Sequence, residues 1–362
     1  MRSRIRSYIK EWTGSRTRRQ LRFAVSGAIS CLFFLCLYAI TIHLIREQPA
    51  QRMAQRWSDQ KDVAQISCFF SAAAGVDEDA LEMFRHSLDS ALLEAAISAE
   101  SPRPGARLWA DAYSAGGRIT LSSERASLET EAVGIGGDFF LFHPQQLLDG
   151  AYFSGNDLMQ DYCVIDQDAA WQLFGSNDVA GMTVSIQGIP HIVAGVVRRE
   201  EGKLYETAGL DSTLVYVSCG TLEELGTSRG ISHYEIVMPN PVAGYAYGYV
   251  KEQLGAQEGE CEIIENTLRY RLLPLWKLLG EFASRSMHSK AIAYPYWENV
   301  ARGYEDMLAI LMLLELLFLL YPAVLLCVAL ISWWKHKKWT FRSVYGHWKD
   351  RLERRMEKWR RV

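Results

Sequence analysis

The sequence predicts an α+β extracytoplasmic domain, built as a split β-α-β layer with an inserted β-rich lobe, between two transmembrane α-helices. Two apolar segments, 23–45 and 307–334, are each longer than the roughly 20 residues needed to cross a bilayer core. The 261 residues between them, 46–306, have the composition of an ordinary soluble domain. A strand-and-helix pattern occurs twice in this middle segment, far apart along the chain, and indicates the α+β class.

The distribution of charge predicts the orientation in the membrane. Residues 1–22 contain eight Lys or Arg and one acid, and residues 335–362 contain eleven Lys or Arg and three acids. The middle segment contains 20 basic and 37 acidic residues. Because short basic segments beside membrane helices stay cytoplasmic, we expect a two-pass plasma-membrane protein with both termini inside. A cleaved signal peptide is the alternative, but the first apolar segment is too long for one, and no small-x-small cleavage site follows Ile45.

Each half of the predicted layer is a strand followed by a helix. The first strand, 64–71, precedes an amphipathic helix whose apolar face contains Leu81, Phe84, Leu88, Leu92 and Ala95. The acidic residues 77–79 suit the positive end of this helix better than a calcium site, because no EF-hand spacing follows. The second strand, 232–238, leads through an Asn240-Pro241 start into a helix that ends at Gly255, and 261–267 is a further strand.

The inserted lobe, about 136–225, has a β-rich pattern. Residues 183–187 alternate as a strand, a turn is expected at 188–190, and Ile192, Ala194 and Val196 alternate on the returning strand. A short helix, 166–174, ends at Gly175.

Four cysteines lie in the predicted domain, namely Cys68, Cys163, Cys219 and Cys261. They could form two disulfides in three connectivities, but a domain of this size buries an adequate core without them. Cys68 and Cys261 lie in strand-like apolar runs, where a cysteine is commonly a small buried residue. Buried thiols are therefore the favoured interpretation, and the disulfide status stays open.

Several motifs of the inserted lobe occur in a recognisable order. A strand leads to Gly136 and Phe139-Phe140, followed by Leu147-Leu148-Asp149-Gly150 and Tyr152-Phe153. Then come a strand at 164–166, a helix ending in Phe174-Gly175, and a hairpin led by Gly181 with a turn at Gly188. This order resembles the extracytoplasmic core domain of MacB-like ABC transporter permeases, closely in this lobe and loosely elsewhere. The glycines Gly150, Gly175, Gly181 and Gly188 are interpreted as turn and helix-end positions with positive φ, and not as a site.

The resemblance implies a membrane subunit of an ABC-type transport or mechanotransmission complex. In that family a separate ATPase subunit moves the membrane helices, and the motion reaches the outer domain. Two departures stand out: Ala151 follows Gly150 where the family usually has arginine, and one apolar segment follows the domain where the family has three membrane helices. The chain is then a partial permease, an accessory to a further permease subunit, or a descendant that no longer transports. Two helices cannot enclose a pathway, so an oligomer is expected.

A different function class stays open beside this one. The chain could serve as an extracellular binding or sensing module, anchored by two helices and without transport. A neighbouring or co-purifying ATPase would separate the two hypotheses. The substrate cannot be read from the sequence.

No motif in the sequence points to catalysis, a cofactor or a metal. The chain has no Walker A loop, HExxH, CxxC, paired Cys/His spacing or GxSxG elbow. We therefore expect a non-enzymatic domain that folds as a unit without cofactor or metal. Nucleic-acid binding is not expected, because the outer domain is acidic and topology explains the basic ends.

The candidate site residues are predicted partner contacts. Glu315 is the only acid in either apolar segment. Because a carboxylate facing lipid is costly, we expect Glu315 to be protonated, to lie near the outer interface, or to be turned toward another helix. Our hypothesis is that this helix belongs to a partner. The segments 1–22 and 335–362 repeat apolar and aromatic residues at helical spacing among basic ones, which is typical of amphipathic basic helices. The tail either lies on anionic membrane lipids, the favoured interpretation, or docks on an ABC ATPase through Tyr345, Trp348, Arg351 and Arg355.

Overall fold

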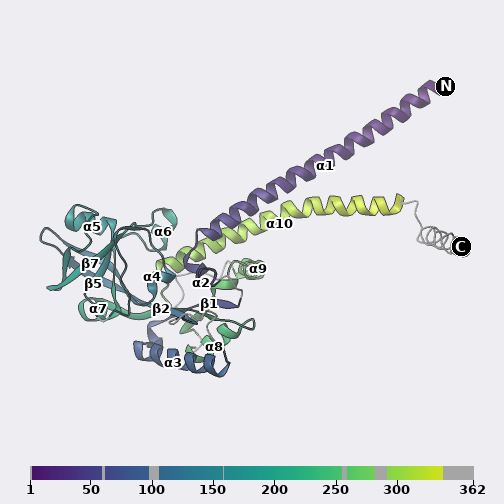
Figure 1. Ribbon diagram of the computed structural model, residues 1–362. Coiled ribbons are helices and arrows are strands. Elements are labelled where there is room, and N and C mark those ends of the chain that lie inside the picture. Colours follow the sequence, from purple (N-terminus) through teal and green to yellow (C-terminus); the bar gives the residue numbers. More distant parts are fainter. Residues whose placement is uncertain are drawn as a thin grey trace, which may run out of the picture. The chain divides into compact units, whose positions relative to one another are not determined.

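The computed structural model describes residues 2–58, 62–97, 106–157, 159–254, 259–281 and 292–336. These residues form two compact units: Ile42–Ile310, here called the domain, and the described residues on either side of it, here called the helical unit. Two long helices, α1 (Arg2–Arg46) and α10 (Tyr296–His336), contribute residues to both units (Figure 1).

The domain is organised around one ten-stranded sheet. Its strands are β1 (Val63–Phe70), β2 (Ala110–Ser122), β3 (Ser127–Gly137), β4 (Leu147–Gly150), β5 (Tyr162–Asp166), β6 (Thr183–Ile186), β7 (Ile189–Val197), β8 (Leu214–Ser218), β9 (Thr227–Pro239) and β10 (Cys261–Glu265). The described helices of the domain are α2 (Met53–Trp57), α3 (Glu78–Glu94), α4 (Phe139–Phe142), α5 (Gln167–Phe174), α6 (Lys203–Ala208), α7 (Cys219–Leu225), α8 (Tyr245–Leu254) and α9 (Leu272–Glu281). Three 3₁₀ turns, η1 (Ala50–Arg52), η2 (Ala72–Ala74) and η3 (Asn266–Leu268), complete the described elements.

The strand order joins the two predicted lobes. The order is β10-β1-β9-β2-β3-β8-β5-β7-β4, and the long strands β2 and β3 pair from Ala112↔Gly137 to Ser122↔Ser127. Because β9 pairs with β1 on one edge and with β2 on the other, it connects the split layer to the inserted lobe. In the lobe, β6 pairs with both β7 and β2, so the strands β2, β3, β8, β5, β7 and β6 close into a ring.

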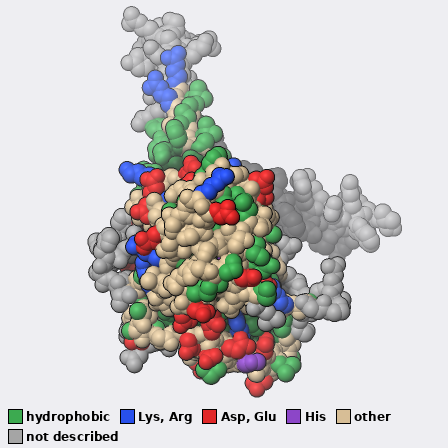
Figure 2. All heavy atoms as spheres, turned by 90° about the vertical axis from the view of Figure 1, so that its left-hand side faces the viewer, with side chains coloured by type: hydrophobic (Ala, Val, Ile, Leu, Met, Phe, Trp, Pro, Cys, Tyr) green, Lys and Arg blue, Asp and Glu red, His purple; other side chains and the backbone are tan. Residues whose placement is uncertain are grey.

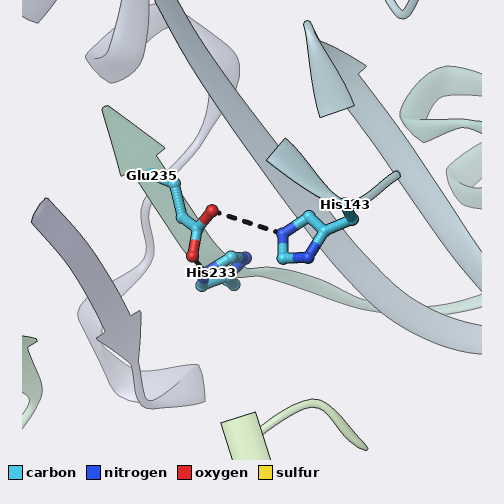
Figure 3. A group of neighbouring side chains, drawn as sticks. All are labelled: His143, His233 and Glu235. Carbon is cyan, nitrogen blue, oxygen red and sulfur yellow. Dashed lines mark ion pairs between the residues drawn. The ribbon is translucent and has the colours of Figure 1, made fainter. Parts of the chain in front are cut away.

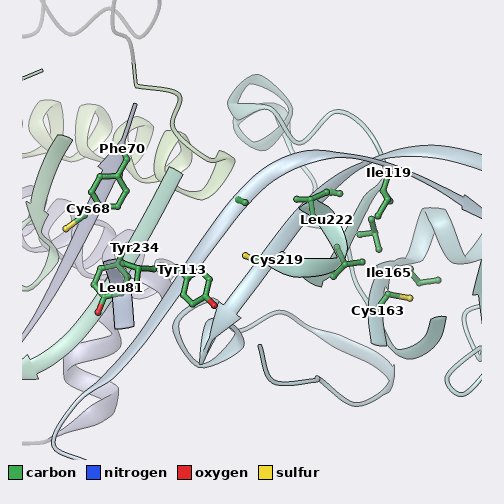
Figure 4. Packing of buried hydrophobic residues seen from close by; sticks show 14 of the residues in the cluster. Cys68, Phe70, Leu81, Tyr113, Ile119, Cys163, Ile165, Cys219, Leu222 and Tyr234 are labelled. Atoms are coloured by element: carbon green, nitrogen blue, oxygen red, sulfur yellow. The ribbon is translucent and has the colours of Figure 1, made fainter. Parts of the chain in front are cut away.

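Two hydrophobic clusters pack on the sheet. In the first, α3 and α8 pack against β1 and β9, and the cluster continues to Ile165 and Leu222 in the inserted lobe (Figure 4). The second contains Phe139, Phe142 and Tyr216 together with Trp297 from the start of α10. Neighbouring strand residues supply different clusters, as Ile236 and Val237 do, because successive side chains of a strand point to opposite faces.

The α+β class and the first strand-and-helix half are confirmed. Leu81, Phe84, Leu88 and Leu92 are buried on α3, and the acidic start is a helix cap, because Asp77 accepts a hydrogen bond from the Ala80 backbone N–H. Ala95 lies beyond the end of α3 and is exposed, so its place on the apolar face is wrong. The inserted lobe shares one sheet with the layer, since β2 and β3 extend through both.

The predicted start of the second helix is wrong by several residues. Gly244 adopts a φ of 87°, which a right-handed helix cannot contain, and α8 begins only at Tyr245. Asn240 still serves the helix start, because its Oδ1 accepts a hydrogen bond from the Ala246 backbone N–H at 3.1 Å.

The hairpin in the inserted lobe also differs in detail. Its turn is at Gln187-Gly188, with φ of 50° and 88°, so the strand has already resumed at Ile189. The register of β7 against β5 then shifts between Val193 and Gly195. This bulge buries both Val193 and Val196 and breaks the predicted alternation.

Further predictions on this lobe are confirmed. The helix at 166–174 is α5, with Asp166 as its N-cap. Positive φ is found at each of the four motif glycines, namely Gly150, Gly175, Gly181 and Gly188. No disulfide joins the seven cysteines, all of which are among the described residues, in agreement with the favoured interpretation. Burial raises the pKa of Cys163 to about 12, which makes this thiol a packing group.

Candidate functional site

The two apolar helices contact each other in the helical unit through small and polar residues. Ser30 Oγ donates a hydrogen bond to the Phe318 carbonyl at 2.7 Å, and the Phe33 and Phe318 rings stack at 5.3 Å. A Cβ at Gly27 would lie 3.4 Å from Leu325. Both helices, as Leu21–Arg46 and Tyr296–Lys335, are long and apolar enough to cross a membrane. Such contacts between small residues are what hold helices together in lipid.

Glu315 lies at this helix contact. Thr41 Oγ1 on α1 donates a hydrogen bond to Glu315 Oε1 at 2.6 Å, so the carboxylate is turned toward the other helix of its own chain. Its contact with a partner protein stays a prediction. The residues Tyr345, Trp348, Arg351 and Arg355 lie outside the described part of the chain, so the docking of the tail also stays a prediction.

The first turns of α10 are fixed in the domain by a buried charge network. The Arg269 guanidinium donates to both Glu298 carboxylate oxygens at 2.7 and 2.8 Å and to Glu305 at 2.6 Å. Arg302 donates to Glu298 at 2.8 Å and to Glu262 on β10 at 2.6 Å. Burial alone would lower the pKa of Arg269, but Glu298 and Glu305 raise it well above its usual range. The network therefore ties α10 to η3 and β10 by charges that stay ionised.

Aromatic packing adds to this attachment. Trp297 on α10 is buried, and its ring lies 5.5 Å from Phe139, the first residue of α4. The hydroxyls of Tyr296 and Tyr216 are 3.1 Å apart, which joins the same turn of α10 to β8. The start of α10 is thus part of the domain core, whereas the rest of the helix belongs to the helical unit.

One group of polar residues was not foreseen from the sequence. His143, the residue after α4, lies beside His233 and Glu235 on β9, and all three are buried (Figure 3). Burial lowers the pKa of His143, although Glu235 acts in the opposite direction. For Glu235, burial raises the pKa, but His143 and His233 outweigh this and hold it well below its usual range. The sequence did contain one indication of this group. His233 and Glu235 are polar residues on one face of a strand, and the other face carries Tyr234, Ile236 and Met238.

The surfaces of the two units differ in chemistry. Figure 2 shows many Asp and Glu side chains on the visible face of the domain, and hydrophobic side chains along the visible part of the helical unit. The exposed apolar side chains of the helical unit include Leu32, Phe33, Leu317, Leu320 and Leu326.

Several solved structures are similar to parts of this chain at low sequence identity. Similar solved structures include the periplasmic region of MacB from Actinobacillus actinomycetemcomitans, at 14% identity and a TM-score of 0.38, covering 62% of this chain and 94% of that one. The extracellular domain of the noncanonic ABC-type transporter YknZ from Gram-positive bacteria has 16% identity and a TM-score of 0.36, covering 55% and 99%. A domain of a putative permease protein from Porphyromonas gingivalis has 15% identity and a TM-score of 0.33, covering 60% and 96%. No curated protein sequence matches the chain.

The family match rests on more than half of the sequence. The family model of the MacB-like periplasmic core domain matches residues 48–247. With its two apolar helices, the chain is a membrane protein with an extracytoplasmic domain. It belongs to the family of the MacB-like periplasmic core domain, a part of ABC-type transporter permeases.

Proposed function

We propose that this chain is a membrane subunit of an ABC-type transport or mechanotransmission complex, in which a separate ATPase acts on the extracytoplasmic domain through the membrane helices. The observation that carries the proposal is α10, a single 41-residue helix that contributes to both the domain and the helical unit. A helix shared in this way can carry a displacement from one unit into the other.

The buried network at Arg269 makes that transfer effective. Breaking one partner of a buried ion pair costs about 3–5 kcal/mol, because a charge is left uncompensated. A force on α10 therefore acts on β10 and η3, to which Arg269 and Arg302 are bonded, before it can pull the helix out of the core.

The proposed partners extend the family match. An ABC ATPase is the protein to which we assign ATP hydrolysis, because MacB-like domains are parts of ABC-type permeases. A further permease subunit or further copies of this chain would complete the complex. Membrane lipids are the expected contact of the basic segments 1–22 and 335–362. The chain itself acts without catalysis.

The proposed orientation places both termini in the cytoplasm. Lys10→Cys and Asp350→Cys should be shielded from an impermeant thiol reagent in intact cells, because they lie in the basic segments. Leu93→Cys is the matched control, since Leu93 is 80% exposed on α3 and should be labelled. Labelling at residue 10 or 350 at the rate of residue 93 would disprove this orientation.

The function is tested by isolating the complex from its native membrane in mild detergent. We expect an ABC ATPase to co-purify, and Glu315→Leu to reduce recovery of a partner membrane protein while the variant inserts normally. Thr41→Val is the control that removes the contact within the chain and keeps the carboxylate. Isolation of the chain with no ATPase, from membranes in which it is functional, would favour the binding or sensing module instead.

A further inference from the structure

The cluster of His143, His233 and Glu235 has an unusual set of unmet polar contacts. The three residues are 3%, 1% and 2% exposed. Nε2 of each histidine and Oε2 of Glu235 are buried and have no hydrogen-bond partner among the described residues. Yet the three side chains lie beside one another, as Figure 3 shows. Buried polar atoms are nearly always hydrogen-bonded, so three neighbouring buried atoms without a hydrogen bond require an explanation.

Each carboxylate oxygen of Glu235 lies at a distance from one histidine nitrogen that is close to the separation of two metal ligands. His143 Nε2 lies 3.3 Å from Glu235 Oε2, and His233 Nε2 lies 3.2 Å from Glu235 Oε1. Ligands about 2.0–2.1 Å from a tetrahedral zinc ion are separated by roughly 3.3 Å. The ligand atoms of all three residues lie within 4.8 Å of one another, so the two ring nitrogens need to approach by at most about 1.5 Å to complete such a site.

The surrounding hydrogen bonds resemble the outer shell of a metal site. Ser67 Oγ donates to Glu235 Oε1 at 2.7 Å and itself accepts from Asn266 Nδ2 at 2.7 Å, which fixes the carboxylate and leaves Oε2 open. His233 Nδ1 lies 3.4 Å from Ser114 Oγ, so the opposite ring nitrogen is the one left for a ligand contact. Outer partners of this kind orient metal-binding histidines and carboxylates.

Simple ion pairing explains the cluster less well. The ring nitrogens lie within ion-pair distance of the carboxylate and favour its charged form, but neither is placed to make a hydrogen bond to it. Aromatic rings enclose the cluster: Trp297 lies 4.6 Å from the His143 ring, and Phe69 lies 4.9 Å from the His233 ring. A dication that accepts electron pairs from both imidazoles and the carboxylate compensates all three groups at once.

We propose that His143, His233 and Glu235 bind a divalent transition-metal ion, for which Zn²⁺ is the best match. Two imidazoles and one carboxylate are a donor set that zinc sites use, with a fourth position left to water or another ligand. A cavity of about 40 Å³, lined in part by His143, Gln145, Tyr296 and Trp297, borders the His143 side of the cluster and has room for water. The site joins β9 to α4 beside the start of α10. It does not depend on the proposed transport function.

The test uses the full chain in mild detergent, stripped by a chelator and then titrated with Zn²⁺ alone. We expect one Zn²⁺ per chain by elemental mass spectrometry, and a higher thermal midpoint with zinc than without. Glu235→Gln, His143→Asn and His233→Asn should reduce bound zinc to background. Ser67→Ala, which removes an outer partner, should weaken binding about 10–100-fold. His191→Asn is the matched control, because His191 is equally buried, lies on β7 and is no part of the cluster.

Cobalt gives a readout that does not depend on the folding of variants. Co²⁺ bound to the stripped wild-type chain should show the visible bands of a four-coordinate site with nitrogen and oxygen ligands. A thiolate-to-cobalt band would place the metal on cysteine and overturn the proposal. Absence of any zinc or cobalt uptake at micromolar metal, or equal uptake by Glu235→Gln and His191→Asn when both fold, would overturn it as well.

Discussion

The domain and the helical unit place polar and apolar groups in opposite positions. In the domain, apolar side chains such as Leu88 are buried, and polar side chains mostly lie outside. In the helical unit, apolar side chains such as Leu317 are exposed, and the hydroxyls of Ser30 and Thr41 lie at the contact between the helices. The domain thus buries its apolar side chains, whereas the helical unit exposes them, and the solvent expected around each unit accounts for the difference.

The physical reason is the solvent expected for each unit. Burying apolar surface from water is worth about 25 cal/mol per Å², and this drives the packing of α3 on the sheet. Between helices in lipid that driving force is absent, so small residues and hydrogen bonds must provide the association. The same substitution, such as leucine to alanine, should therefore change stability by different amounts in the two units.

The largest expected effect is in the buried charge network of the domain. Arg269→Ala removes the guanidinium that bonds both Glu298 and Glu305 in the buried network and should cost about 3–5 kcal/mol. Pulse proteolysis of the full chain in urea, in mild detergent, measures the loss. Arg118→Ala, which removes an exposed ion pair with Glu131, is the control and should leave stability unchanged within error. Equal losses for both variants would contradict the distinction between buried and exposed charge.

Leucine truncation compares the two units directly. Leu88→Ala removes a fully buried side chain of α3 and should cost about 2–5 kcal/mol. Leu93→Ala on the same helix, where the side chain is 80% exposed, should change stability by less than about 0.5 kcal/mol. Leu317→Ala should leave both domain stability and membrane insertion unchanged, because its exposed side chain is expected to face lipid. A large loss for Leu317→Ala would mean that this face is covered by a partner.

A pH-dependent effect is expected for a buried polar group of the domain. Asp166 accepts hydrogen bonds from the backbone N–H groups of Ala169 and Leu214, and burial raises its pKa from 3.8 to about 6. The folded state therefore binds the proton more tightly than the unfolded state. The stability from this group is fully present below pH 3.8 and is lost as the pH rises through about 6, by roughly 1.4 kcal/mol per unit of pKa difference.

Two variants isolate that contribution. The difference in unfolding free energy between the wild type and Asp166→Asn should vary between pH 4 and 7, since only the wild-type group titrates there. Ser218→Ala removes the N-cap of α7, whose hydroxyl does not titrate, and should cost about 1 kcal/mol at every pH. A constant difference for Asp166→Asn would show that its pKa is not raised.

The smallest expected effect is the hydrogen bond in the helical unit. A double-mutant cycle of Thr41→Val and Glu315→Leu, read from the stability of the helix pair in mild detergent, should give a coupling of about 0.6 kcal/mol. A coupling several times larger would mean that the surroundings of Glu315 are drier than those of other membrane helix contacts.

The elements that repeat with a simple period could be predicted from the sequence. The four buried positions on the face of α3, from Leu81 to Leu92, and the glycine at 175 each depend on neighbours a few residues away, and both features were placed correctly. The start of α8 and the turn at Gln187-Gly188 were misplaced. Each depends on a residue with positive φ, Gly244 in the first case and Gln187 in the second, and hydrophobic periodicity does not report backbone angles.

The metal-like cluster could not be predicted, for a different reason. His143 and Glu235 are far apart along the chain and meet only because β9 pairs between β1 and β2, next to the turn that carries α4. Motif searches detect ligands that share a helix or a loop, and this cluster draws on separate elements. Glu315 could be singled out from composition alone, but its partner Thr41 could not.

The position of β1 has a consequence for synthesis of the chain. β1 is made early, yet its two neighbours in the sheet are β9 and β10, which end at Pro239 and Glu265. At roughly 5–20 residues per second, the chain from β1 to β10 takes on the order of 10–40 s to be made. During that interval both edges of an apolar strand stay unpaired, and unpaired edges invite aggregation. We therefore expect β1 to need protection from aggregation until β9 and β10 have been synthesised and can pair with it.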